Sequence, residues 1–422
     1  MTTASHPGDA LSRGRLILYI VALGALVALG PFTIDLYLPA FPRVAAEFHA
    51  PDSEIQLTLT ATTIGFGLGQ LFVGPLSDRV GRRWPLLLAT VLHVVARVAV
   101  ALAPSVPILI ALRVVQGIGA AGGGVVAMAM VRDLFGGQPL IRMLSRLALV
   151  TGLAPILAPV IGSQLLAVLD WRGVFWCLAA YGLVILVAAV FLIHETLPAE
   201  LRNASGHSTV GQRYRALFHD RVFLGVLVIG GMNFAGVFTY LSASPFIFQD
   251  GFHLSAQVFG VLFGINSLGL VISSQAASRI MRRVPPSRVL VFSLPMILLA
   301  SIALILDGFV FESPPLLAVA IPFFVLIASA GFTFPTVQVL ALAGHGREAG
   351  TAASLLGAAN FGLAGAISPI VGLIGVTPQH TGMVIAVTGS IALVSLWVLV
   401  RPLRHGVVSD DTGSIEIPGA LG

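Results

Sequence analysis

The sequence predicts an all-α integral membrane protein whose twelve transmembrane helices form two pseudo-symmetric six-helix bundles. The first observation is composition: of the 422 residues, 57% are hydrophobic and 10% are charged, and the mean hydropathy is +0.97. A soluble chain has about 45–50% apolar and about 25% charged residues. The second is the length of the apolar runs, which are continuous rather than alternating, as a β-barrel would require. The third is a repetition between the two halves of the chain. The hydrophobic fraction amounts to about 240 residues, enough for about twelve spans of ~20 residues each.

Twelve apolar runs are separated by prolines, glycines and charges. The spans are predicted at 16–40, 54–76, 84–103, 106–131, 142–168, 173–193, 221–245, 255–280, 287–307, 314–340, 348–374 and 380–402. The longest polar stretch follows the sixth span and divides the chain six plus six. We therefore predict a first bundle over 1–194, a cytoplasmic linker over 195–220, a second bundle over 221–403 and a cytoplasmic tail over 404–422.

The arginines predict the orientation of the chain. All 23 basic residues are Arg, and 19 of them fall in segments on the same side as the N-terminus. Only Arg43 and Arg172 fall on the other side, while Arg97 and Arg113 lie inside spans. Because short cytoplasmic loops carry the excess of positive charge, both termini are predicted to be cytoplasmic. Arginines spread between apolar runs do not indicate a nucleic-acid surface, and the single cysteine, Cys177, excludes an internal disulfide.

The two halves repeat each other at nearly one spacing. Gly69 recurs 200 residues later as Gly269, and the Gly-Leu-Ala segment at 152–154 recurs 210 residues later at 362–364. Small loop insertions in a duplicated six-helix unit explain the growing offset. Repeats with a site at their interface are typical of transporters.

A glycine- and charge-rich loop joins the second and third spans. Asp78 can pair with an arginine and cap a helix end, and Gly74 and Gly81 are expected to allow tight turns. Ordinary positive-inside charge explains the arginines but not the spacing of the glycines and the aspartate. The segment resembles the signature loop of the major facilitator superfamily, in which it implies a conformational latch. The latch residues are Gly74, Asp78, Arg79, Gly81, Arg82 and Arg83.

The end of the first span carries Asp35, the only acid that lies away from the ends of a predicted span. An intramembrane carboxylate is a functional site by default. Pro31 and Pro39 flank it, so the helix is expected to be irregular there. The alternative is a solvated aspartate at the mouth of the span. The segment Asp-Leu-Tyr-Leu-Pro-Ala-Phe-Pro at 35–42 resembles that of the Bcr/CflA-type drug:proton antiporters.

Arg113, in the fourth span, is the predicted partner of Asp35. Both lie toward the outer end of their spans, where a pairing is geometrically possible, and the second half has no matching arginine. Arg113 begins a segment that resembles the R-x-x-Q-G motif of proton-coupled members, which implies that Asp35 and Arg113 couple transport to protons. His93 and Arg97 share a face of the third span. Arg97 is expected to extend to the outer surface, or else to be a second partner for Asp35.

The fifth span has small residues four apart, Ala154, Ala158 and Gly162, which allow close helix approach. With Pro155 and Pro159 the segment resembles, in part, the antiporter motif of drug-exporting facilitators, although Ala158 stands where that motif has its second glycine.

Several other polar and aromatic side chains inside spans are candidates for an amphipathic substrate cavity, although most such residues merely pack. The candidates are Tyr37, Asn233, Phe238, Asn266 and Asn360.

The resemblance implies a proton-coupled secondary transporter that exports drug-like or amphipathic small molecules across the bacterial inner membrane. The alternatives are a metabolite exporter, for example of amino acids, a proton symporter, and, from a different class, a channel or a non-transporting receptor. A channel would show rings of like charge along a pore, and an ATP-driven pump would carry a G-x-x-x-x-G-K-[ST] loop; the sequence has neither. We expect no enzyme activity, no cofactor, no metal and no nucleic-acid partner. The expected partners are the substrate, protons and the lipid bilayer, and the expected state is a monomer.

Overall fold

The computed structural model describes residues 12–198, 200, 202, 217–343 and 349–402. Within these residues it contains twelve helices long and apolar enough to cross a membrane, one for each predicted span, which confirms the fold class. The predicted tail, 404–422, lies outside the described residues, as does most of the predicted linker, so the domain bounds stay a prediction. The long helices are α1 (Arg13–Asp35), α3 (Asp52–Val80), α4 (Arg83–Ala101), α5 (Val106–Leu134), α6 (Gly137–Val168), α7 (Trp171–Leu192), α9 (Arg221–Phe246), α10 (Ala256–Ile280), α11 (Pro286–Val310), α12 (Leu316–Leu342), α13 (Ala349–Ile367) and α15 (Pro378–Ser395).

Short elements complete the ends of four spans. A 3₁₀ turn, η2 (Leu38–Ala40), and helix α2 (Phe41–Phe48) follow α1, and a π-helical turn, η4 (Ile247–Gly251), follows α9. Helix α14 (Ile370–Ile374) follows α13, and a second π-helical turn, η6 (Leu396–Val400), ends the last span.

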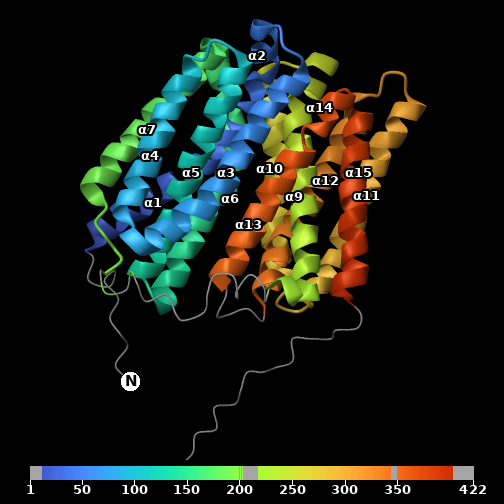
Figure 1. Ribbon diagram of the computed structural model, residues 1–422. Helices are drawn as coiled ribbons and strands as arrows, with labels where there is room; N and C mark the ends of the chain where they lie inside the picture. Colours follow the sequence, from blue (N-terminus) through green and yellow to red (C-terminus); the bar gives the residue numbers. More distant parts are fainter. Residues whose placement is uncertain (1–11, 199, 201, 203–216, 344–348, 403–422) are drawn as a thin grey trace, which may run out of the picture.

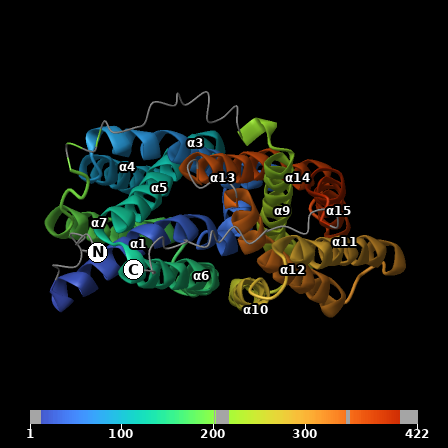
Figure 2. The ribbon, with the colours of Figure 1, turned by 90° about the horizontal axis from the view of Figure 1, so that it is seen from below.

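The helices pack in two groups, which we call the first half (α1–α7) and the second half (α9–η6). Figure 2 shows the blue-to-green helices gathered on one side and the yellow-to-red helices on the other. In Figure 1 the described chain begins and ends at the lower end of the helices, whereas α2 lies at the upper end. We call these ends the termini face and the opposite face.

The sequence repeat places glycines at corresponding helix crossings. A Cβ on Gly69 would lie 2.7 Å from the carbonyl oxygen of Ile118, where α3 packs on α5. A Cβ on Gly269 would lie 2.7 Å from the Phe324 ring, where α10 packs on α12. These are the second and fourth spans of each half, so the recurring glycine serves the same close helix approach twice.

The halves are joined by side-chain hydrogen bonds near the opposite face. Gln56 donates to the Ser242 carbonyl at 3.2 Å, and Gln257 donates to the Ser163 carbonyl at 3.0 Å. Gln249 also donates to the carbonyl of Pro39 at 3.2 Å. Toward the termini face, a Cβ on Gly124 of α5 would meet nothing within 4 Å. These side-chain hydrogen bonds therefore join the halves near the opposite face, while an added Cβ at Gly124 would meet no neighbouring atom.

Candidate functional site

Asp35 lies at the break between α1 and the 3₁₀ turn. Helix α1, with Pro31 inside it, ends at Asp35, and Pro39 stands in the turn that follows, so the predicted irregularity is present. Asp35 is 5% exposed, which contradicts the alternative of a solvated aspartate. It is the only buried acid of the described residues. Because a carboxyl can carry a proton as a neutral group, this position suits proton exchange within the membrane.

Arg113 is fully buried beside the same turn but does not pair with Asp35. Its Nη1 donates to the backbone carbonyl of Thr33 at 3.2 Å and to Oε1 of Gln116 at 2.8 Å. Its guanidinium carbon lies 4.8 Å from the centre of the Tyr37 ring. In this conformation Arg113 therefore holds the backbone two residues before Asp35, and a direct ion pair between the two stays a prediction for another conformation.

Arg97 does not extend to the surface, and that expectation is wrong. Its side chain is fully buried, with Nη1 donating to the Leu178 carbonyl and Nη2 donating to Oγ1 of Thr33 at 2.9 Å. His93 lies in the same cluster, with Nδ1 2.9 Å from the Gln116 carbonyl oxygen, to which it donates. The turn before Asp35 is thus surrounded by two arginines and a histidine.

All buried charged side chains of the described residues belong to the first half. The second half instead supplies most of an aromatic cluster between the halves. Phe234 and Phe238 stack with ring centroids 4.8 Å apart, and Phe234 packs edge-on against Phe361 at 4.9 Å. Phe66 of the first half stacks on Phe361 at 5.3 Å, so the cluster crosses the interface. Such faces can bind the planar part of an amphipathic molecule.

The predicted cavity residues do not share one cavity. Phe238 belongs to the aromatic cluster, and the Oδ1 atom of Asn360, the residue before Phe361, lacks a hydrogen-bond partner. Tyr37 is fully buried beneath Arg113. Asn266 donates to the Tyr240 hydroxyl at 2.6 Å and lines a separate hollow of about 280 Å³ between α10 and α12.

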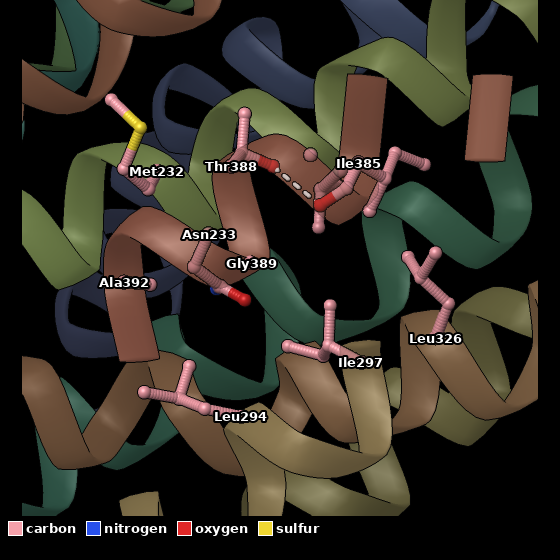
Figure 3. Close-up of a pocket in the computed structure, with 11 residues that line it drawn as sticks. Met232, Asn233, Leu294, Ile297, Leu326, Ile385, Thr388, Gly389 and Ala392 are labelled. Atoms are coloured by element: carbon pink, nitrogen blue, oxygen red, sulfur yellow. Dashed lines mark hydrogen bonds between the residues drawn. The ribbon is translucent and has the colours of Figure 1, made fainter. Parts of the chain in front are cut away.

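Asn233 lines a different cavity, inside the second half. This narrow space of about 10 Å³ is walled by α9, α11, α12 and α15, and Figure 3 shows the Asn233 amide between Gly389 and Leu294. Both polar atoms of the amide lack partners. Thr388, on the facing wall, donates its hydroxyl to the Ile385 carbonyl at 3.0 Å. A buried amide with free polar atoms can hold a water or a small polar group.

Helix α6 makes the closest approach to the turn that bears Asp35. An ideal Cβ on Gly162 would lie 2.2 Å from the backbone oxygen of Leu36. Ala154 and Ala158 are buried on the same helix, as the small-residue spacing predicts. Pro155 and Pro159 lie within α6, and the Pro159 carbonyl borders Gly260 of α10. The segment that resembles an antiporter motif therefore packs against both the Asp35 turn and the second half.

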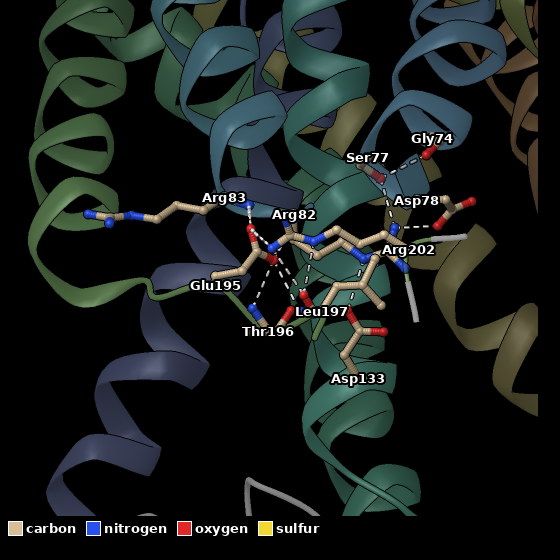
Figure 4. Close-up of polar contacts among 10 residues, drawn as sticks. All are labelled: Gly74, Ser77, Asp78, Arg82, Arg83, Asp133, Glu195, Thr196, Leu197 and Arg202. Carbon is tan, nitrogen blue, oxygen red and sulfur yellow. Dashed lines mark hydrogen bonds and ion pairs between the residues drawn. The ribbon is translucent and has the colours of Figure 1, made fainter. Parts of the chain in front are cut away.

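The loop between α3 and α4 forms a polar cluster on the termini face, shown in Figure 4. Arg82 pairs with Asp78 and, through Nε at 2.9 Å, with Asp133 of α5. Gly81 adopts φ +101°, a conformation that favours glycine. Gly74 makes no turn, because it lies inside α3, and that expectation is wrong. All ion-pair partners described for this cluster belong to α3, α4, α5 or the segment after α7, and its role as a latch stays a prediction.

Glu195, which we did not predict as a site residue, fastens this loop to the segment after α7 (Figure 4). Its carboxylate accepts from the backbone N–H groups of Arg82 at 2.8 Å and Arg83 at 3.3 Å, and from those of Thr196 and Leu197 at 3.0 Å each. Partial burial alone would raise the pKa of the Glu195 carboxyl, but the four N–H groups together hold that pKa below its ordinary value. The available signal was an acid directly after the sixth span, on the face that carries nineteen arginines.

Comparison with known proteins gives consistent matches over most of the chain. Residues 21–369 match the sequence profile of the Major Facilitator Superfamily. A Bacillus subtilis protein named uncharacterized MFS-type transporter YdgK is 35% identical over 379 residues, 89% of this chain and 94% of the relative. The bicyclomycin resistance protein homolog of Haemophilus influenzae is 29% identical over 84% of this chain and 88% of its own length. Multidrug resistance protein MdtL of Vibrio parahaemolyticus is 27% identical over 95% of this chain and 99% of its own length.

Solved structures share the fold at low sequence identity. A partially occluded, inward-open structure of the xylose transporter XylE from E. coli has a TM-score of 0.72 at 15% identity, covering 91% of this chain and 96% of the other. An inward-facing, occupied structure of a bacterial homolog of the human lysosomal transporter Spinster has a TM-score of 0.70 at 13% identity, covering 93% and 98%. At these identities the likeness concerns the fold alone.

Proposed function

Because the chain belongs to the Major Facilitator Superfamily, and is thus a secondary transporter with twelve membrane spans rather than an enzyme, we propose that it exports drug-like or amphipathic small molecules in exchange for protons. The burial of Asp35, 5% exposed at the broken end of α1, carries the proposal. A buried carboxyl in a membrane transporter is a natural carrier for the driving proton. Two relatives bear names that refer to bicyclomycin resistance and multidrug resistance, which supports the choice of drugs as substrates.

In this proposal the first half binds the proton, and the aromatic cluster between the halves binds the substrate. Asp35 and Arg113 of the first half couple proton binding to the position of α1, since Arg113 holds the Thr33 carbonyl. The aromatic cluster, with the free Oδ1 of Asn360 beside it, receives the substrate. A proton and a substrate that bind to opposite sides of one interface can each favour a different arrangement of the halves.

The termini face is cytoplasmic in this proposal, and the membrane is the inner membrane of a bacterium. The arginine distribution supports this orientation. The hydrogen bonds of Gln56 and Gln257 then join the halves toward the outside. Substrate enters from the cytoplasm in this conformation and leaves after the outer contacts separate.

A resistance screen tests the proposal. The chain is expressed in a bacterium that lacks its own drug pumps, and growth is measured across a panel of hydrophobic antibiotics. We expect higher resistance to at least one compound, and no gain for Asp35→Asn at equal protein level. Asp307→Asn, at the end of α11 in the second half, is the matched control and keeps the gain. No resistance to any compound, together with excretion of an amino acid, would replace drug export by metabolite export.

A further inference from the structure

Thr33 is held from two sides by two buried arginines that come from different helices. Arg97 of α4 donates to the Thr33 hydroxyl at 2.9 Å, and Arg113 of α5 donates to the Thr33 carbonyl at 3.2 Å. All three residues are fully buried. Thr33 lies two residues before Asp35 in the last turn of α1, so both bonds act on the backbone that carries the buried carboxyl.

Arg97 is itself fixed in place by α7. Its Nη1 donates to the Leu178 carbonyl, while Nη2 reaches Thr33. Helix α1 packs on α6, α5 and α7, and α4 packs on α5 and α7, whereas α1 and α4 make little contact with each other. The side chain of Arg97 therefore provides a direct polar link across a pair of helices that make little other contact.

The link continues through hydrogen bonds to Arg113. Nε2 of His93 lies 3.4 Å from the Thr33 hydroxyl, and Nδ1 donates to the carbonyl of Gln116. Oε1 of Gln116 in turn accepts from Arg113 at 2.8 Å. The cluster thus forms a closed ring of contacts around one residue of α1.

Burying a guanidinium without a carboxylate partner costs free energy, because the charge loses its hydration and gains no opposite charge in return. The structure pairs neither Arg97 nor Arg113 with an acid within its described residues, and the Nε atom of Arg97 has no partner. An apolar side chain of similar volume is often as stabilising as a buried charge or more so. Packing alone therefore does not account for an arginine at this position.

We propose that Arg97 is a positioning residue of the proton site: acting through Thr33, it fixes the last turn of α1 and thereby the place of Asp35. This proposal rests on the proposed function, because it assigns Arg97 a part in the same proton coupling. Loss of the link frees the α1 end to turn, and the carboxyl then no longer exchanges its proton at the same place or pH. The charged and titratable side chains around this turn are Asp35, Tyr37, His93, Arg97, Arg113 and Tyr181.

Transport assays with three variants test the link. Arg97→Gln and Thr33→Val remove opposite ends of the same hydrogen bond, and Arg43→Gln is the matched control. Arg43 also donates to a backbone carbonyl, that of Leu166 at 2.7 Å, but it makes no contact with Thr33. In proteoliposomes we measure export against pH, with turnover and KM determined separately, for a compound found in the resistance screen.

Arg97→Gln and Thr33→Val are expected to lower turnover about tenfold, equivalent to about 1.4 kcal/mol, with KM changed less than threefold. Both are expected to move the pH of half-maximal export by a similar amount, and the double variant should add little to either single one. Thr33→Ser, which keeps the hydroxyl, recovers the pH profile that Thr33→Val shifts. The proposal is overturned if the effects of Arg97→Gln and Thr33→Val add up in the double variant. It is also overturned if the variants keep the pH profile of the wild type and differ only in yielding less folded protein.

A labelling assay reads the position of the α1 end without transport. In a Cys177→Ser background, Asp35→Cys is labelled with a soluble methanethiosulfonate reagent. We expect Arg97→Gln to raise the labelling rate about tenfold and Arg43→Gln to leave it unchanged; equal rates in all backgrounds contradict a positioning role. If the wild type exports nothing in the screen while the labelling rate still rises, the proposed function fails but the link between Arg97 and the α1 end stands.

Discussion

Replacing Gly162 with alanine should separate α6 from the turn that bears Asp35. The added Cβ would lie 2.2 Å from the Leu36 oxygen, whereas ordinary contact begins at 3.4 Å, so the two backbones must part by about 1.2 Å. The obstructing atom is a backbone oxygen and cannot rotate away. Overpacking of this kind costs about 1–3 kcal/mol, and each 1.4 kcal/mol changes a population about tenfold.

Thermal unfolding of the purified protein and drug resistance in cells measure this effect. Gly162→Ala should lower the Tm by several degrees and lower resistance at equal expression. Gly152→Ala is a matched control on the same helix, because its Cβ would meet only Val271 at 3.8 Å. If Gly162→Ala keeps the Tm of the wild type and transports within twofold of it, the close contact at Leu36 does not exist in the protein and the reasoning fails.

Three further predictions concern the rest of the site. Glu195→Gln should destabilise the loop cluster. Because folding lowers the pKa of Glu195, the carboxylate contributes to stability above its unfolded pKa of 4.5, and this contribution is lost as the pH falls through the lower pKa of the folded state. The Tm of the wild type should therefore fall more than that of the variant on acidification from pH 6 to pH 3.5. Phe361→Ala should raise the KM for an aromatic substrate about three- to tenfold, since ring contacts contribute about 0.5–1.5 kcal/mol each. Alanine at Phe309, an exposed residue of α11, should leave the KM unchanged; equal KM values for the two variants would remove the substrate from the cluster. Arg113→Lys should fail to restore the activity lost in Arg113→Gln, because an ammonium cannot reproduce the planar contacts with Thr33, Gln116 and the Tyr37 ring; full activity of the lysine variant would show that charge alone suffices.

The spans followed from the sequence because membrane-crossing helices need long apolar runs, and each predicted run matches a helix of the structure. Asp35 could be singled out in the same way, since a carboxyl amid apolar residues is conspicuous. The break of α1 at Asp35 followed from the prolines on either side of it.

The details of the site depended on which helices are neighbours, which no local pattern records. Arg97 seemed free to reach the surface, but α7 presents the Leu178 carbonyl and α1 presents Thr33, so the guanidinium is bound in the interior. Gly74 looked like a turn residue beside Pro75, yet α3 continues through both of them to Val80. Glu195 acts on a loop 113 residues earlier in the chain through backbone N–H groups, which leave no signature in the sequence.

Proton release on substrate binding tests the central claim most directly. Purified protein in weakly buffered detergent solution, with a pH-sensitive dye, is mixed with a compound identified in the resistance screen. Competition between proton and substrate predicts a release of protons by the wild type and none by Asp35→Asn, although the variant still binds the compound. Equal proton release by the two proteins, or binding without any release by the wild type, would contradict drug–proton exchange at Asp35.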